Sequence, residues 1–222
     1  MHRCLQSTVF TLLGIICIVG SARAQGSIRV GMDGGLNFAK DYFSDNQSTY
    51  RVRTGVVAGG IIDLGISDLW HLQLEPRYIQ SGRKESWVIT GDDPTPLAIA
   101  DLVFKLDYLE IPLLLEAKMG AANIKPVLFA GPNIGFLLSG KADWDGVDVR
   151  QFGFPQSSDV KDDYKSVNFS VDLGAGGEYR ISEAISLLAN VRFSSGLVHI
   201  RKEGLNINSS GIQILAGFLY DL

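Results

Sequence analysis

The chain of 222 residues contains very little cysteine, and this scarcity already excludes several kinds of site. Its two cysteines, Cys4 and Cys17, both lie within the first 24 residues, a segment that we expect to be removed. The rest of the chain has no thiol for a disulfide, a thiolate metal site or a cysteine nucleophile. Histidine is also rare, because only His71 and His199 follow that segment. Catalysis by histidine therefore has few candidates.

The chain also lacks an excess of positive charge and a long apolar run. It has 20 basic and 24 acidic residues, and no basic stripe indicates nucleic-acid binding. Beyond residue 24, no stretch approaches the eighteen or so consecutive apolar residues that a transmembrane helix requires. Capped amphipathic helical segments are nearly absent, whereas glycine is abundant at 25 residues. This composition favours an all-β chain that forms one domain.

Residues 1–24 have the features of a secretory signal peptide. Arg3 contributes to a positive amino-terminal region, an apolar run follows over residues 9–20, and Ala22-Arg-Ala24 forms an A-x-A cleavage site. An uncleaved membrane anchor is the alternative, but the run is too short to span a bilayer and small residues follow it directly. We therefore predict a cleaved signal peptide over residues 1–24 and an exported, acidic domain over residues 25–222.

Apolar and polar residues alternate through nearly all of the mature chain. In the segment DYLEIPLLLEAK, for example, Leu109, Ile111 and Leu113 alternate with a set of positions that includes Glu110 and Glu116. Successive side chains of a β-strand point to opposite faces, so this segment would have one apolar and one charged face. The predicted strands cover residues 27–38, 51–64, 71–78, 104–118, 125–139, 167–180, 186–194 and 211–222.

The connections between these strands alternate between long and short. The long ones cover residues 40–50, 81–100, 141–165 and 196–209, and the short ones cover residues 65–68, 120–123 and 181–184. Transmembrane barrels have short periplasmic turns and long extracellular loops, whereas a soluble sandwich or lipocalin-like barrel needs no such asymmetry. Only a closed barrel satisfies every backbone group of strands in lipid. We predict an eight-stranded antiparallel up-and-down transmembrane β-barrel in the bacterial outer membrane.

The charged face of this barrel would line its interior. An eight-stranded barrel is just wide enough for side chains to fill it, and an unpaired charge there is costly. We therefore predict a structural network of ion pairs and expect Arg77 to pair with Glu110, because their strands are neighbours. A narrow pore lined by the same groups is the alternative. The predicted interior charges are Arg29, Asp33, Arg53, Asp63, Glu75, Arg77, Glu110, Glu116, Asp172, Glu178, Arg180 and Arg192.

One residue does not fit the regular strand pattern. Pro112 lies in the middle of a predicted central strand, and proline cannot donate a hydrogen bond to the ladder. We expect either a β-bulge or a missing hydrogen bond at this position.

Catalytic and metal-binding features are weak in this sequence. His199 with Ser194 or Ser195 would make a base–nucleophile pair, but serine and histidine are common in such loops. The segment DWDGVD at residues 143–148 resembles a cation-binding turn, yet it lacks the EF-hand spacing, so a solvated acidic loop is the simpler interpretation. We expect no catalytic residue, no cofactor, no metal site and no enzymatic activity.

The longest predicted loop, residues 141–165, contains three aromatic residues, Trp144, Phe152 and Phe154. We expect them to be exposed. Exposed aromatic residues of this kind indicate contact with a partner or a glycan, or packing within the loop itself. This loop is therefore the first candidate for a partner-contact surface.

Four blocks of the sequence carry a resemblance to a known family. They are YLEIPLLL at residues 108–115, KPVLFAGPNIG at 125–135, DVKDDYKS at 159–166 and LGAGGEY at 173–179. Together, and in this order, they resemble the Bacteroidetes outer-membrane β-barrel (PorT-like) proteins, small barrels often grouped as a porin family. The resemblance covers essentially the whole mature chain. It implies an eight-stranded outer-membrane barrel, and some members of that family are linked to secretion of surface proteins and gliding.

Taken together, these features predict an integral outer-membrane protein with a lumen filled by side chains. We expect a structural or interaction role through the extracellular loops, with membrane lipid and an envelope protein as partners and no nucleic acid. The alternatives are a narrow small-solute porin and an accessory component of a surface-protein secretion system.

Overall fold

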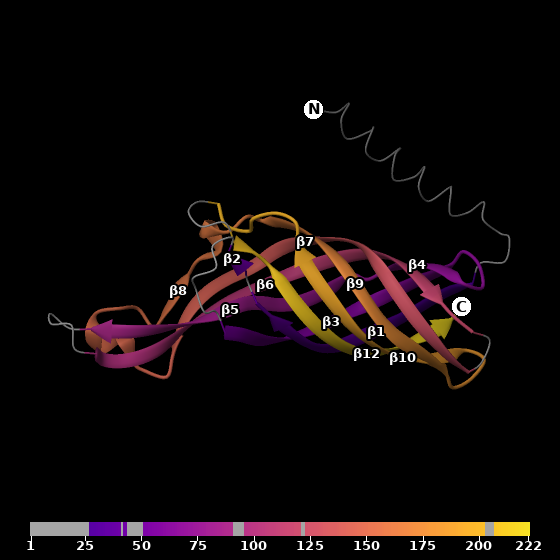
Figure 1. Cartoon of the computed structure of the whole chain (residues 1–222), viewed down its shortest axis with the longest axis horizontal. Helices are drawn as coiled ribbons and strands as arrows, with labels where there is room; N and C mark the ends of the chain where they lie inside the picture. Colours follow the sequence, from indigo (N-terminus) through magenta and orange to yellow (C-terminus); the bar gives the residue numbers. More distant parts are fainter. Residues whose placement is uncertain (1–26, 41, 44–50, 91–95, 121–122, 203–206) are drawn as a thin grey trace, which may run out of the picture.

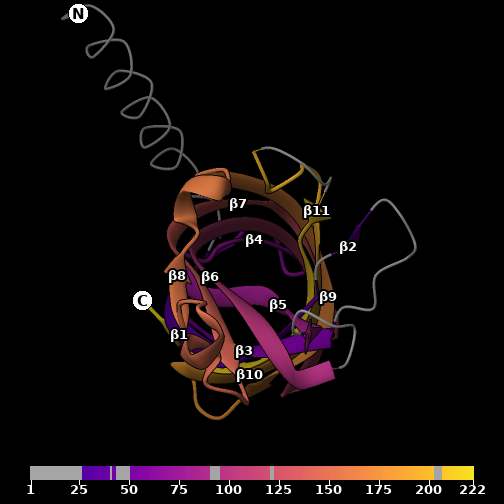
Figure 2. The same cartoon turned by 90° about the vertical axis from the view of Figure 1, so that its left-hand side faces the viewer.

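The alternating segments form long antiparallel strands that close into a barrel (Figure 1, Figure 2). The computed structural model describes residues 27–40, 42–43, 51–90, 96–120, 123–202 and 207–222. The predicted signal peptide lies outside these residues. The wall consists of β1 (Ile28–Ala39), β3 (Arg51–Gly65), β4 (Trp70–Leu74), β5 (Arg77–Thr90), β6 (Pro96–Lys118), β7 (Ile124–Asp145), β9 (Val167–Arg180), β10 (Ile185–Gly196) and β12 (Ser210–Asp221).

Along the chain, each strand of the wall pairs with the next one, except that β4 and β5 do not pair with each other, and β12 pairs with β1 to close the ring. The strands β4 and β5 lie end to end between β3 and β6. Together they therefore count as one of the eight strands of the wall. Short turns join the strands at one end of the barrel, called the inner end below. Longer connections lie at the opposite, outer end. This arrangement confirms the predicted eight-stranded up-and-down topology.

The barrel is apolar outside and polar inside, the reverse of a soluble protein. Met32 and Leu173 are 55% and 59% exposed on the outer surface, whereas Asp63 and Asp172 are fully buried in the interior. The two sets follow directly from the alternation of each strand, because neighbouring residues point to opposite faces. Within the described residues, no helix is long and apolar enough to cross a membrane.

Three neighbouring strands extend well beyond the rest of the wall at the outer end, to the left in Figure 1. Residues 81–90 and 96–100 belong to β5 and β6, and β7 continues to Asp145. The prediction of a loop over residues 81–100 was therefore wrong over its described part, and the prediction of a loop over residues 141–165 was wrong at residues 141–145 and 157–159. Below, the outer extension means residues 83–90, 96–106 and 140–159, which include the 3-10 helix η1 (Val149–Phe152) and β8 (Ser157–Asp159).

The outer extension forms as strand rather than loop because it has a small core of its own. Ile89, Ala100 and Val149 are buried together, and several partly buried residues pack against them. Those packing residues are Ala98, Trp144, Val147 and Phe152. A polar-looking stretch therefore gains a buried apolar face once β5, β6 and β7 are paired.

Residues from two of the long connections at the outer end fold into the mouth of the barrel. Tyr164, Ile200 and Ile207 are buried against apolar side chains of the wall, and we call these three residues the outer plug. The backbone of Lys165 donates to the carbonyl of Ile200 (2.8 Å), and Ile200 donates to that of Ile207 (2.9 Å). Two further short elements lie here, the 3-10 helix η2 (Lys161–Asp163) and the pair β2 (Tyr42–Phe43) with β11 (Ile207–Asn208).

Pro112 causes a missing hydrogen bond but no bulge. It lies opposite Glu75, in the gap between β4 and β5, and the Glu75 N–H donates to the Pro112 carbonyl (3.2 Å). Proline has no N–H to return the bond. The irregularity between β6 and β7 lies elsewhere, between Asp107 and Tyr108, where β7 holds the additional residue Leu138.

Candidate functional site

Charged side chains fill the inner half of the lumen as a first group, which we call the inner cluster. Arg29 contacts Asp63 (2.9 Å) and Glu178 (2.6 Å). Lys118 contacts the same two carboxylates, at 2.6 Å from Asp63 and 2.9 Å from Glu178, and lies 3.2 Å from Glu116. These five residues come from β1, β3, β6 and β9, so the cluster links strands on several sides of the barrel. His71 adds a further contact, Nδ1 to Asp63 at 2.7 Å.

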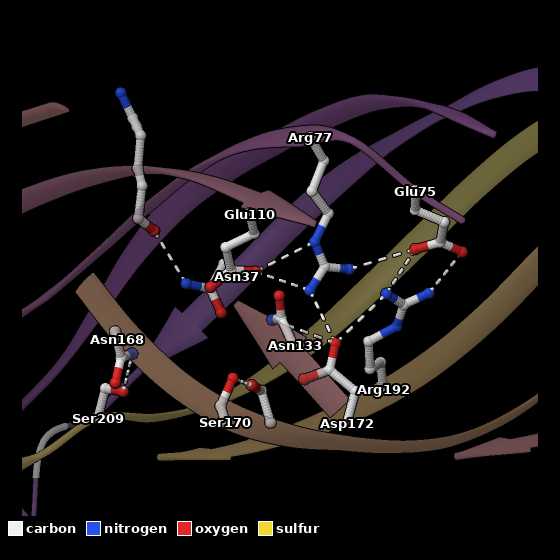
Figure 3. A network of polar contacts seen from close by, with 12 residues as sticks. Asn37, Glu75, Arg77, Glu110, Asn133, Asn168, Ser170, Asp172, Arg192 and Ser209 are labelled. Carbon is white, nitrogen blue, oxygen red and sulfur yellow. Dashed lines mark hydrogen bonds and ion pairs between the residues drawn. The ribbon is translucent and has the colours of Figure 1, made fainter. Parts of the chain in front are cut away.

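A second group, the central cluster, lies next to it and is shown in Figure 3. Arg77 contacts Glu110 (2.8 Å) and Asp172 (3.0 Å), which confirms the predicted pair of Arg77 with Glu110. Arg192 makes two hydrogen bonds to Glu75, at 2.6 and 2.9 Å. Arg77 and Arg192 are almost completely buried. Such a network is stabilising only while every member keeps its partners, since an unpaired buried charge is costly.

The charges of the central cluster do not balance. Arg77 and Arg192 face three carboxylates, and a fourth, Asp33, interacts electrostatically with both arginines and with Glu75. Asp33 is buried, and neither of its carboxylate oxygens has a hydrogen-bond partner among the described residues. The centre of the lumen therefore has an excess of negative charge and of hydrogen-bond acceptors.

Two cavities in the lumen are very small. One cavity beside Gln213 and another beside Gln73 each have a volume of about 20 Å³, close to that of a single water molecule. A wide vestibule of about 600 Å³ opens at the inner mouth, and Arg180 and Lys125 line it. The outer plug covers the opposite end. The inner cluster, the central cluster and the outer plug thus close the barrel, as far as its side chains are described.

Most of the predicted interior charges lie inside the barrel, with one exception. Arg180 is exposed at the inner mouth, because the strand β9 ends there and the side chain extends into the vestibule. Arg53 is buried as predicted, but its guanidinium donates to the carbonyl of Ser81 rather than to a carboxylate. The prediction omitted Lys118 and His71 from the network. Both alternate in phase with other interior residues of their strands, so the strand period already contained the signal.

The loop residues that were considered for catalysis and for cation binding contact other groups instead. His199 Nδ1 bonds Asn208 Oδ1 (2.8 Å), and the Ser194 hydroxyl lies 3.5 Å from that of Ser170, so the base–nucleophile pair is not formed. Asp143 contacts Lys105 at 2.7 Å. Within the described residues, no group of three or more histidine, cysteine, aspartate or glutamate side chains is arranged to hold a metal ion.

The aromatic residues of the predicted loop differ in exposure. Trp144 and Phe152 pack against the core of the outer extension, so the expectation that both are exposed was wrong. Phe154 is 50% exposed, with its ring 6.4 Å from that of Trp144. Nearby, a hydrogen bond from the Arg150 guanidinium holds the pKa of the Asp148 carboxyl below its usual range. Packing within the loop therefore accounts for two of the three aromatic residues.

Comparisons with known proteins agree with this architecture. Residues 22–201 match the family model described as "Outer membrane protein beta-barrel domain". Two solved structures of similar fold are Neisserial surface protein A and a major outer membrane protein from Thermus thermophilus. The first is 16% identical and covers 89% of this chain and 99% of its own, with a TM-score of 0.51. The second is 9% identical, with the same coverage and a TM-score of 0.53.

No curated protein matches this chain. At such low identity the two solved structures show a shared fold alone, whereas the family model covers most of the chain. The apolar belt, the filled lumen and the family match agree with one another. The chain is an integral barrel of the bacterial outer membrane and belongs to the outer membrane protein beta-barrel domain family.

Proposed function

We propose that this protein is a closed membrane anchor that presents the outer extension to a protein partner in the cell envelope. The observation that carries the proposal is the contrast between the two parts of the molecule. Ion pairs and the outer plug fill the lumen, while β5, β6 and β7 project beyond the wall as an ordered sheet with its own core. The protein acts by binding and not by catalysis.

The surface of the outer extension supports a binding role. Val88 and Ile99 are cross-strand neighbours on its hairpin, and they are 54% and 68% exposed. Phe154 is also exposed. Apolar side chains that lie beyond the lipid-facing belt gain nothing from the membrane, and exposed apolar groups of this kind mark interaction sites. Trp87, which is half exposed, is the neighbour of Val88 along β5.

The first test concerns the lumen. Purified protein in planar bilayers is expected to show no unitary conductance steps at high salt, because the ion pairs and the outer plug leave no continuous path. Single-channel recordings of the wild type and of Glu110→Gln make the comparison. Regular steps in the wild type whose size changes in Glu110→Gln would show that the interior groups line a pore, and a small-solute porin would then replace this proposal.

The second test concerns the outer extension. A photoreactive phenylalanine analogue placed at Ile99 in living cells is expected to form a discrete protein adduct of higher mass on illumination. The same analogue at Leu173, which is similarly exposed but faces lipid, is the matched control and should form none. Gel mobility after illumination is the measurement.

A further variant tests whether the adduct at Ile99 requires the outer extension to be folded. Val149→Asp places a carboxylate in the core of the outer extension, where Val149 is fully buried. The adduct at Ile99 should disappear, while the barrel keeps the heat-dependent shift in gel mobility of a folded membrane barrel. An adduct that persists in Val149→Asp, or equal adducts at Ile99 and Leu173, would contradict the proposal.

A finer proposal concerns the family branch. We infer from the four sequence blocks, among them residues 108–115 and 125–135, that the chain belongs to the PorT-like proteins of Bacteroidetes. A component of a surface-protein secretion system is then the partner to be sought at the outer extension. Identification of the Ile99 adduct by mass spectrometry tests this, and an adduct with a protein unrelated to secretion would count against it.

A further inference from the structure

The small cavity in the outer half of the lumen has an unusual lining. Its volume is about 20 Å³, and Glu110 is the charged residue of its lining. The carbonyl of Ser81, another lining residue, accepts a hydrogen bond from the Arg53 guanidinium. The lining residues that matter here are Asn37, Glu110, Gln213, Ser194, Ser209 and Ser210. Figure 3 shows Asn37 beside Glu110. A cavity of this size holds one water molecule or one small ion.

Two of the lining side chains have acceptor oxygens without a partner. Asn37 and Gln213 are 2% and 1% exposed, and neither Asn37 Oδ1 nor Gln213 Oε1 has a hydrogen-bond partner within the described part of the chain. They lie directly opposite each other on β1 and β12. Native proteins rarely bury such atoms unsatisfied, so each points to a missing binding partner.

Glu110 supplies the third oxygen. Both hydrogen bonds from Arg77 reach Oε2 of this carboxylate, at 3.1 and 2.8 Å, so Oε1 is the oxygen left for another ligand. Ser194, Ser209 and Ser210 also line the cavity, and a serine hydroxyl can accept as well as donate. The Ser209 hydroxyl already accepts from the Asn168 amide (2.9 Å). The set combines one carboxylate with several neutral oxygens, which suits a hard cation of low charge. Calcium and magnesium sites usually employ more carboxylates or retain several waters.

The charge of the central cluster favours a cation over a water molecule. Four buried carboxylates, those of Asp33, Glu75, Glu110 and Asp172, share two guanidinium groups. A neutral water would satisfy the acceptor oxygens but would leave this excess charge uncompensated in a medium of low dielectric constant, where it is costly. A positive ion at the cavity satisfies both requirements at once.

We propose that this cavity is a binding site for a monovalent cation of the size of sodium, held by Glu110, Asn37 and Gln213 together with serine hydroxyls. The ion is part of the closed lumen and stabilises the fold. This inference is independent of the proposed partner at the outer extension, because it concerns only the interior of the barrel.

The test compares two salts of equal ionic strength. The full mature protein, folded in detergent micelles, is unfolded by urea in sodium chloride and in N-methyl-D-glucamine chloride, whose cation is too large for the cavity. At a sodium concentration ten times the dissociation constant, the unfolding equilibrium constant should fall about tenfold relative to the organic salt. Equal unfolding midpoints of the wild type in the two salts would overturn the proposal.

Variants test whether the sodium-dependent shift in stability arises at this cavity. Glu110→Gln also weakens the ion pair with Arg77, so the quantity compared is the sodium-dependent shift and not the absolute stability. Gln213→Leu removes a proposed ligand without touching an ion pair. Both variants should lose the shift, whereas Glu178→Gln, altered in the inner cluster, should keep it. A shift that survives in the first two variants would place the ion elsewhere and contradict the assignment.

Anomalous diffraction can show the bound ion directly. Crystals grown with thallium(I), a heavy monovalent cation, should show an anomalous peak between Glu110, Asn37 and Gln213. A cavity that holds density for water alone, with no anomalous signal, would overturn the proposal even if stability responds to sodium.

Discussion

Replacing Arg77 with methionine is expected to lower the free energy of unfolding by about 3–5 kcal/mol. Arg77 is buried and contacts the carboxylates of Glu110, Asp172 and Glu75, at 2.8, 3.0 and 3.5 Å. Methionine preserves much of the volume but removes the positive charge, and three buried carboxylates then lose a shared partner. Urea unfolding of the barrel in lipid vesicles, followed by tryptophan fluorescence, measures the change.

A surface arginine provides the matched control for this experiment. Arg150 contacts one carboxylate, Asp148, at 2.7 Å, and both side chains are exposed. Exposed ion pairs contribute little to stability because water screens them. The change Arg150→Met should therefore leave the urea midpoint unchanged. Equal midpoints for the two variants would show that the central cluster does not hold the lumen together.

A double variant identifies the source of the loss. If the cost of Arg77→Met comes from uncompensated carboxylates, then adding Asp172→Asn should recover part of the stability, because one negative charge disappears. If the cost came from lost packing alone, the second change would add to the first. The sign of the coupling between the two substitutions distinguishes these causes.

The second large effect is expected at a glycine. A β-carbon added to Gly35 would lie 1.9 Å from the carbonyl oxygen of Ile214 on the paired strand β12, far inside van der Waals contact. The obstructing atom is backbone, so relief requires that β1 and β12 move apart. Gly35→Ala should therefore cost about 3 kcal/mol or more, the upper part of the range for overpacking. The fraction of heat-modifiable protein after refolding, together with urea unfolding, measures it.

The same substitution at Gly60 should have the opposite result. A β-carbon there would meet only the carbonyl oxygen of Gly31, at 3.9 Å, which is ordinary contact. Alanine reduces the freedom of the unfolded chain, so Gly60→Ala should leave stability unchanged or raise it by up to about 1 kcal/mol. A loss at Gly60 as large as that at Gly35 would mean that glycine is needed for backbone conformation and not for close approach of the strands.

The transmembrane part of the barrel could be predicted from the sequence because its strands follow one simple period. Residues 107–118 show this well: Leu109 and Leu113 face lipid, and Glu110 and Glu116 lie inside. The pairing of Arg77 with Glu110 followed from the neighbouring places of their strands. The exposure of Arg180 did not follow, because alternation gives the face of a residue but not its distance from the end of the barrel.

Other features depended on contacts between distant segments. The outer plug joins Tyr164 with Ile200 and Ile207, and no local pattern marks these residues as buried. Leu114 lies inside the barrel as its position requires, but its cluster with Phe129 and Val127 could not be read from alternation. The cavity beside Gln213 likewise arises from β1, β5, β6, β10 and β12 together.

The alternation of apolar and polar residues was sufficient to predict the barrel, its inside-out polarity and most of the charges in its lumen, because successive side chains of a strand point to opposite faces. Three features became visible only in the folded structure: the strands of the outer extension, the burial of the outer plug in the outer mouth, and the excess of carboxylates over arginines in the central cluster. Each of these depends on which strands become neighbours. Burial and charge balance are properties of the assembled interior, and they appear only when the ring closes.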